Sequence, residues 1–144
     1  MDICVPCKSI EQVRCWLSML IATTVIASKK SDDGSDLINT FVESLKAYHP
    51  GDDIESQLDP MKLDQVGDIS NVFGADIFLS RSVLYSCIVV AHIYGAYSGK
   101  VKSLVHEWAA LLNIPDSAMK LMEVRGKSHW KSDFMKINPN RGGK

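Results

Sequence analysis

The sequence predicts a single, compact, all-α domain of about six or seven helices. Apolar residues recur at three- and four-residue spacing in several segments, which is the pattern of helices that bury one face. No run of β-branched residues alternates with polar ones for long enough to form a sheet. The stretch Ser82–Gly99 carries no charged residue, which suits a central helix that is buried nearly all round.

Composition agrees with one globular domain. The chain has 144 residues, of which 46% are hydrophobic and 23% charged, so it can bury a core without covalent staples. Residues 1–124 contain ten Lys or Arg and sixteen Asp or Glu, a net charge of −6. Residues 125–144 contain six basic residues and one acidic residue, a net of +5. We therefore expect one helical domain over residues 1–124 and a basic, flexible tail over residues 125–144.

Start and stop signals bound each expected helix. Ser9 with Gln12 resembles a capping box at the first helix, and Pro60 suits the first turn of another. Gly74, Gly99 and Pro115 mark turns between helices. The expected helices span residues 9–27, 36–48, 53–58, 60–73, 77–96, 100–113 and 116–124.

Part of this pattern repeats. A long apolar helix, a turn with glycine and a shorter amphipathic helix that ends near a proline occur in Ser9–Pro50 and again in Ile77–Pro115. Two such hairpins can bury each other's apolar faces. We expect the long helix of the second copy to pack against Cys15–Ala27 of the first.

Two apolar segments raise the question of membranes and export. Ser82–Gly99 contains several Ser and Tyr residues and His92, which favours a buried helix over a membrane span. Lys8 and Arg14 precede the apolar run Cys15–Ala27, as in a signal peptide that ends near Ala27. Polar residues within that run favour a core helix, so we expect a cytoplasmic protein, with export as the alternative.

The four cysteines do not form an obvious disulfide framework. Cys4, Cys7 and Cys15 crowd into the first fifteen residues, whereas Cys87 lies in the apolar helix. The C-x-x-C spacing of Cys4 and Cys7 could supply half of a zinc site or a redox pair, but no second ligand pair follows. We expect reduced thiols and a chance pair.

No catalytic constellation is assembled by the sequence. His106-Glu107 begins like a zinc-protease motif, but Ala110 stands where the second histidine is needed. His92 lies among apolar residues and is expected to be a core histidine bonded to a carbonyl. The sequence therefore favours a protein that is not an enzyme.

An acidic turn is the candidate metal site. Asp32, Asp33 and Asp36 lie within five residues, and their carboxylates could hold Ca²⁺ or Mg²⁺. They could equally cap the following helix and favour its positive N-terminus. Capping needs no ion, so we expect no cofactor, with a divalent metal as the alternative.

The basic tail is the candidate site for a partner or for nucleic acid. Basic residues interleaved with aromatic ones can follow phosphates and stack bases, or can dock on an acidic protein surface. The residues concerned are Lys127, Trp130, Lys131, Phe134, Lys136 and Arg141.

The repeated hairpin resembles the TerB-like family of tellurite-resistance and stress-associated helical domains. The similar segments are Ile88–Gly95 and Lys102–Pro115, with Ile21–Leu45 as a weaker first copy. Tyr94 stands where the family has an acidic residue before the turn glycine, so the metal site of the family is not retained there. The resemblance implies a non-enzymatic bacterial protein that acts through protein–protein contacts in stress, secretion or mobile-element biology. A metal-responsive domain and a nucleic-acid-binding accessory protein remain alternatives.

Overall fold

The computed structural model describes residues 3–5, 7–27, 66–134, 137 and 138, together with Asn39 and Glu43. Within these residues the chain is mostly helical, which confirms the all-α class. The helices are α1 (Ile10–Ala27), α4 (Ile69–Phe73), α5 (Ile77–Tyr94), α6 (Gly99–Leu111) and α7 (Asp116–Phe134). The two-residue strands β1 (Ile3–Cys4) and β2 (Ile137–Asn138) form one short parallel pair.

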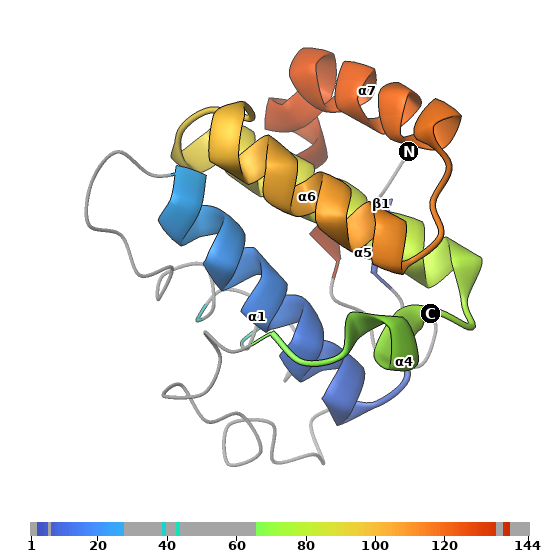
Figure 1. Cartoon of the computed structure of the whole chain (residues 1–144). Helices are drawn as coiled ribbons and strands as arrows, with labels where there is room; N and C mark the ends of the chain where they lie inside the picture. The colour runs from blue at the N-terminus through green and yellow to red at the C-terminus, as the bar shows by residue number, and fades with distance from the viewer. Residues whose placement is uncertain are drawn as a thin grey trace.

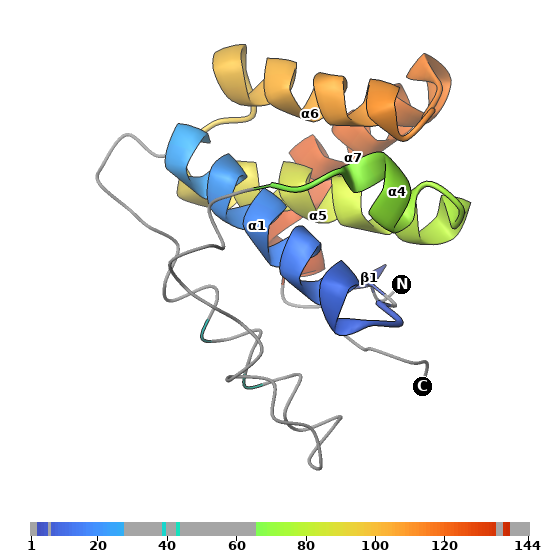
Figure 2. The same cartoon turned by 60° about the horizontal axis from the view of Figure 1, so that its bottom comes forward.

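Helix α5 is the centre of the bundle. It packs most extensively against α7 and α1, and it also contacts α6, α4 and β1 (Figures 1 and 2). The nine residues Val83–Ala91 are all buried, which explains why the sequence carries no charge there. The predicted packing of this helix against the first long helix is confirmed.

Capping interactions define the start of α5 and the end of α6. Asp76 caps α5, because its side chain accepts a hydrogen bond from the backbone N–H of Leu79 at 3.0 Å. After α6, Asn113 adopts a left-handed conformation with φ of 57°. The N–H of Ile114 then donates to Ala109 at 2.9 Å, and that of Asn113 donates to Ala110 at 3.2 Å. This Schellman arrangement ends α6 and turns the chain into α7.

The start of α1 also agrees with its predicted cap. The Ser9 hydroxyl accepts a hydrogen bond from the N–H of Gln12 at 3.2 Å, and the Gln12 side-chain oxygen accepts one from the N–H of Lys8 at 2.6 Å. The reciprocal bond therefore reaches one residue further back than in a standard capping box.

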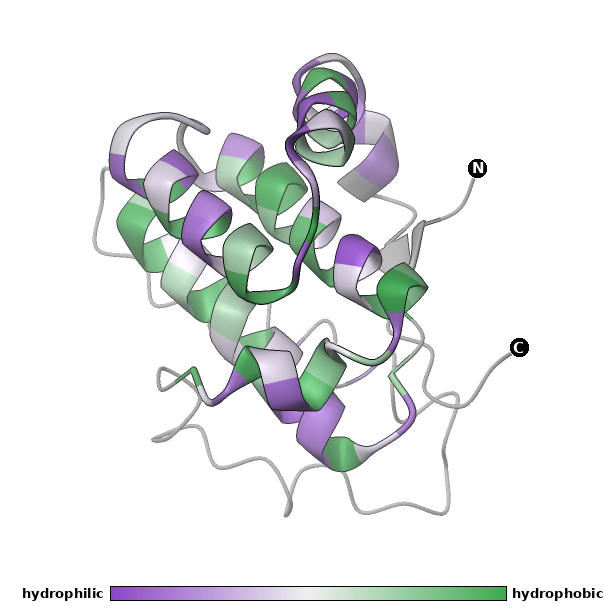
Figure 3. Ribbon diagram, turned by 45° about the vertical axis from the view of Figure 1, so that its right-hand side comes forward, coloured by the Kyte–Doolittle hydropathy of each residue, from purple (hydrophilic) through white to green (hydrophobic). Residues whose placement is uncertain are grey.

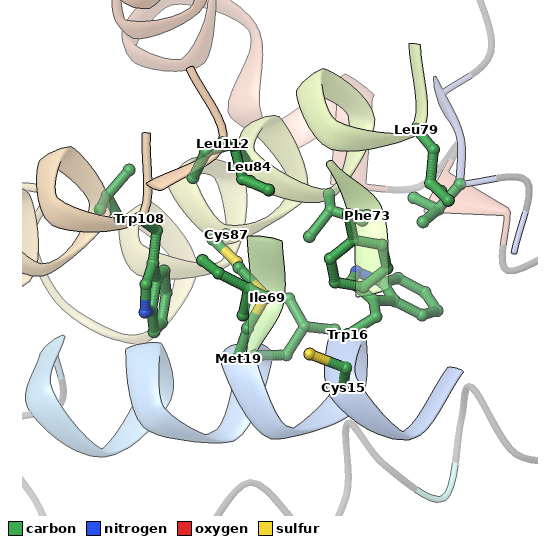
Figure 4. Close-up of a cluster of buried hydrophobic side chains, with 14 of the residues drawn as sticks. Cys15, Trp16, Met19, Ile69, Phe73, Leu79, Leu84, Cys87, Trp108 and Leu112 are labelled. Carbon is green, nitrogen blue, oxygen red and sulfur yellow. The ribbon is translucent and has the colours of Figure 1, made fainter. Parts of the chain in front are cut away.

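The core lies between α1, α4, α5 and α6 (Figure 4). Trp16 of α1 is fully buried, and its indole N–H donates to the Ser86 hydroxyl of α5 at 2.9 Å. The buried hydroxyls of Thr23 and Thr24 donate to carbonyl oxygens one turn earlier in α1. These bonds let polar side chains enter the core without unsatisfied donors. Hydrophobic and hydrophilic residues are interspersed along the helices in Figure 3, as expected of helices that bury one side and expose the other.

The structure corrects the end of the last helix. The sequence predicted a helix ending near Val124 and a flexible tail from Arg125, but α7 continues to Phe134. Gly126 and Asp133 of this added segment are buried. The sequence did not predict this part of the helix, because it has no apolar stripe. A glycine contact and hydrogen-bonded polar side chains hold it against α5 instead.

Helices α1 and α5 are long and apolar enough to cross a membrane, judged by length and composition only. More than half of each is buried inside the bundle. The buried core helix of a globular protein meets the same criterion, so these two helices do not decide between a core and a membrane role.

Candidate functional site

Helix α7 has two sides with different surroundings. Its inner side packs on α5, where Met119, Gly126 and Asp133 are buried at seven-residue spacing. Gly126 allows a close approach, since a β-carbon there would lie 2.7 Å from Ile88 Cγ2. The absence of a side chain at this position therefore sets how near the two helices come.

A buried acid fixes the C-terminal half of α7. Asp133 is only 1% exposed and accepts hydrogen bonds from the Tyr85 hydroxyl and the Arg125 guanidinium. The guanidinium is bidentate, with Nε 2.8 Å from Oδ2 and Nη2 3.0 Å from Oδ1. Burial opposes ionisation of Asp133, but these bonds outweigh it and hold the pKa of the carboxyl below its ordinary value. Burial and the adjoining carboxylate raise the pKa of Tyr85.

A second acid joins α7 to α6 and to the α5–α6 turn. Glu123 Oε2 accepts a hydrogen bond from the Tyr97 hydroxyl at 2.6 Å and lies 2.8 Å from His106 Nε2. An ionised carboxylate can only accept, so His106 carries a proton on Nε2. Burial disfavours the charged form, but the two bonds outweigh it and lower the pKa of Glu123. The pKa of Tyr97 is raised by burial and by Glu123.

His92 lies beneath α7 at the end of α5. Its ring stacks on Trp130 with centroids 6.4 Å apart and contacts Tyr97 at 5.8 Å. Its buried Nε2 has no hydrogen-bond partner among the residues described. Burial, aided by the positive charge of Lys127, lowers the pKa of His92, which keeps the ring neutral. The carbonyl bond expected for this histidine is therefore not found at Nε2.

The outer side of α7 is exposed and carries a different chemistry. Leu121 is 74% exposed and Val124 67%, and the two lie one turn apart. Lys120, Lys127 and Lys131 are also exposed. Their spacing of seven and eleven residues places them within about 40° of one another around the helix. The result is a row of lysines beside an aliphatic pair.

The structure divides the residues predicted for the basic tail. Lys127 and Lys131 lie on the exposed side of α7, whereas Trp130 is half-buried against His92. Lys131 Nζ lies 5.5 Å from the centroid of the Trp130 ring, within cation–π range. Phe134 ends α7, and Lys136 and Arg141 fall outside the described residues.

The predicted metal turn is not part of the chain that the structure describes. Asp32, Asp33 and Asp36 lie outside the described residues. Among the residues that the structure does describe, no three His, Cys, Asp or Glu side chains are grouped so as to hold a metal ion. His106 pairs with Glu123 of α7 and not with a second ligand from its own helix.

The buried thiols also lack the setting of reactive cysteines. Burial raises the pKa of Cys15 to about 11 and that of Cys87 to about 12. Both thiols are free and lie in the core (Figure 4). A reactive cysteine needs the opposite, an exposed thiol of low pKa.

Sequence reasoning missed the carboxylates that organise α7. Arg125 and Asp133 are eight residues apart, beyond the three- and four-residue pairs that helix rules use. Tyr97 and Glu123 belong to different elements, so only tertiary structure joins them. Comparison of the chain with family models, curated proteins and solved structures found no match.

Proposed function

We propose that the chain is a non-enzymatic helical protein, TerB-like in fold, that acts through protein–protein contacts. The proposed fold has six or seven helices in two pseudo-repeated hairpins. Helices α5 and α6 fit the second hairpin, and α1 fits the long arm of the first. The proposed setting is bacterial stress, secretion or mobile-element biology, in the cytoplasm.

The observation that carries the proposal is the exposed aliphatic pair on α7. Leu121 and Val124 stand in water on a helix whose other side is held by a glycine contact and two hydrogen-bonded carboxylates. A rigid helix loses little conformational entropy on binding. Full burial of each aliphatic side chain by a partner is worth about 1.5–3 kcal/mol.

Site-specific crosslinking in the source cell tests this function. A photo-crosslinking amino acid at Leu121 should yield a discrete higher-mass product, identified by mass spectrometry. The same group at Ser103, exposed on α6, is the control and should not yield it. Identical products from both positions, or no product from Leu121, would contradict the proposal. So would a turnover assay that succeeds without any partner.

A second candidate is a nucleic-acid-binding accessory protein, which the exposed Lys127 and Lys131 favour. Trp130 weighs against it, because its half-buried ring already stacks on His92 and has Lys131 over it. The third, a metal-responsive domain at Asp32, Asp33 and Asp36, is tested by calcium titration. An unchanged melting temperature and no heat of binding would remove it.

A further inference from the structure

We propose that the outer face of α7 binds an acidic amphipathic helix of a partner protein. The outer face is defined as Lys120, Leu121, Val124, Lys127 and Lys131. This inference rests on the proposed function and adds the chemical class of the partner. Three observations support it. Helix α7 pairs two of its acidic side chains within the fold, its lysines are exposed in a row, and two aliphatic side chains are exposed beside that row.

Helix α7 pairs two of its three acidic residues within the fold. Asp133 is buried against Tyr85 and Arg125, and Glu123 is bound by Tyr97 and His106. The remaining acid, Asp116, lies in the first turn and forms no ion pair with a described residue. The lysines of the outer face likewise have no ion-pair partner among the described residues. Beyond its first turn, the helix therefore presents positive charge outward although its sequence contains both signs.

The exposed aliphatic side chains lie beside the row of lysines on α7. Val124 lies one turn from Lys120 and one turn from Lys127, and Leu121 extends the aliphatic surface away from the lysine row. A helix with an apolar stripe flanked by Glu or Asp matches both parts of this surface at once. The span from Lys120 to Lys131 is about 16 Å, so about three turns of partner helix would cover it.

The chemistry of the outer face disfavours the other occupants that a basic helix suggests. Leucine and valine give a nucleic acid nothing to stack on, and Trp130 is held against His92. A symmetric contact between two copies of this face would set lysine rows near each other, which repulsion disfavours. Two aliphatic residues make a narrow stripe for a helix that lies in a lipid interface. An acidic protein helix is the occupant that uses both the charge and the aliphatic pair.

Binding of a designed peptide to the full chain is the test. The probe is a fluorescent helical peptide with a leucine stripe flanked by glutamates, and the control peptide has the same composition in scrambled order. We expect anisotropy to show saturable binding of the designed peptide that weakens as salt rises. The scrambled peptide should bind at least about tenfold more weakly, because it cannot align both parts of the face.

Matched variants locate the binding surface. Lys120→Glu, Lys127→Glu and Lys131→Glu combined should weaken binding by about tenfold or more, and so should Leu121→Ser with Val124→Ser. The control combines Arg14→Glu, Arg81→Glu and Lys100→Glu, three exposed positions on α1, α5 and α6 with the same total charge change. It should alter binding by less than about twofold. Circular dichroism melts establish that each variant is folded before it is titrated.

The failures are distinguishable. If Leu121 crosslinks a protein in the cell but neither the designed peptide nor that protein's acidic helices bind, the partner class is wrong and the proposed function stands. If the lysine variants affect binding of a single-stranded oligonucleotide or a phosphatidylserine vesicle but not of the peptide, the inference is overturned. Equal effects of the α7 variants and of the control variant would also overturn it.

Discussion

Gly126 of α7 lies directly against Ile88 of α5, so close that no β-carbon fits between them. The β-carbon of an alanine would meet Ile88 Cγ2 at 2.7 Å. Ile88 is fully buried and β-branched, so its methyl group cannot easily turn away. Gly126→Ala should therefore destabilise the fold by about 1–3 kcal/mol, although alanine gains about 1 kcal/mol in helix propensity. Chemical denaturation measures this change.

A double-mutant cycle isolates the contact between the two helices. In an Ile88→Ala background, Gly126→Ala should be neutral or stabilising, because the obstructing methyl group is gone. Gly67→Ala is the control, since nothing lies within 4 Å of a β-carbon at that position. If Gly126→Ala costs the same in both backgrounds, the close approach is not the cause of the loss.

Asp133→Asn should lower the free energy of unfolding by about 2–3 kcal/mol. The change removes the charge that the bidentate Arg125 neutralises. The loss stays below the roughly 3–5 kcal/mol of a fully buried pair, because the Arg125 side chain is partly exposed and keeps contact with water. Glu107→Gln, an exposed change on α6, should stay within about 0.5 kcal/mol. Equal melting curves for the two variants would contradict the structural role of Asp133.

His92 should make the domain less stable in mild acid. Its pKa in the folded state lies below the ordinary value of 6.5, so the unfolded chain binds the proton more readily. The stability that depends on a neutral His92 is therefore complete above about pH 6.5 and is lost as the pH falls below it. Glu123 and Asp133 act later, because their pKa values are also lowered and their contribution is lost only below their ordinary values of 4.5 and 3.8.

Substitution tests the assignment of this acid response. Unfolding free energies measured from pH 7 to pH 5 should fall less steeply for His92→Asn than for the unmodified chain. His129→Asn removes an exposed histidine from α7 and should leave the slope unchanged. A slope that follows His129 instead of His92 would show that burial under α7 is not the origin.

Cys15 and Cys87 should react slowly with thiol reagents while the protein is folded. Their pKa values of about 11 and about 12 leave almost no thiolate at neutral pH, and both side chains are buried. Peptide-level mass spectrometry after alkylation should show labelling of both only when denaturant is added. Fast labelling of Cys87 in the native protein would contradict the buried core.

The long helices were predictable because their signals are local. The uncharged stretch from Ser82 and the turn at Gly99 placed the end of α5 within a few residues, and Ser9 with Gln12 indicated the start of α1. The repeated pattern of a long apolar helix also led to one packing partner of α5, helix α1, although it did not lead to α7. Such features can be predicted from sequence, because they depend only on neighbouring residues or on the burial of a continuous apolar surface.

The site on α7 was not predictable by the same rules. The inner side of α7 depends on the close approach at Gly126 and on the buried Asp133. The basic composition of residues 125–144 led us instead to expect that both residues belong to a flexible tail. Charge counting added Glu123 and Asp133 to the acidic total, although Glu123 is hydrogen-bonded to Tyr97 and His106, and Asp133 to Tyr85 and Arg125. Only the three-dimensional structure shows which charged side chains are paired within the fold and which are exposed to a partner.

The parallel pairing of Ile3 with Ile137 and of Cys4 with Asn138 has a consequence for how the chain is made. Synthesis on the ribosome releases β1 before β2, and β1 must then wait for its partner until residues 137 and 138 have emerged. The helical core can assemble during that interval from contacts nearer in sequence. Closure of β1 onto β2 is therefore a late, long-range contact, made only after the helices between the two strands have been synthesised.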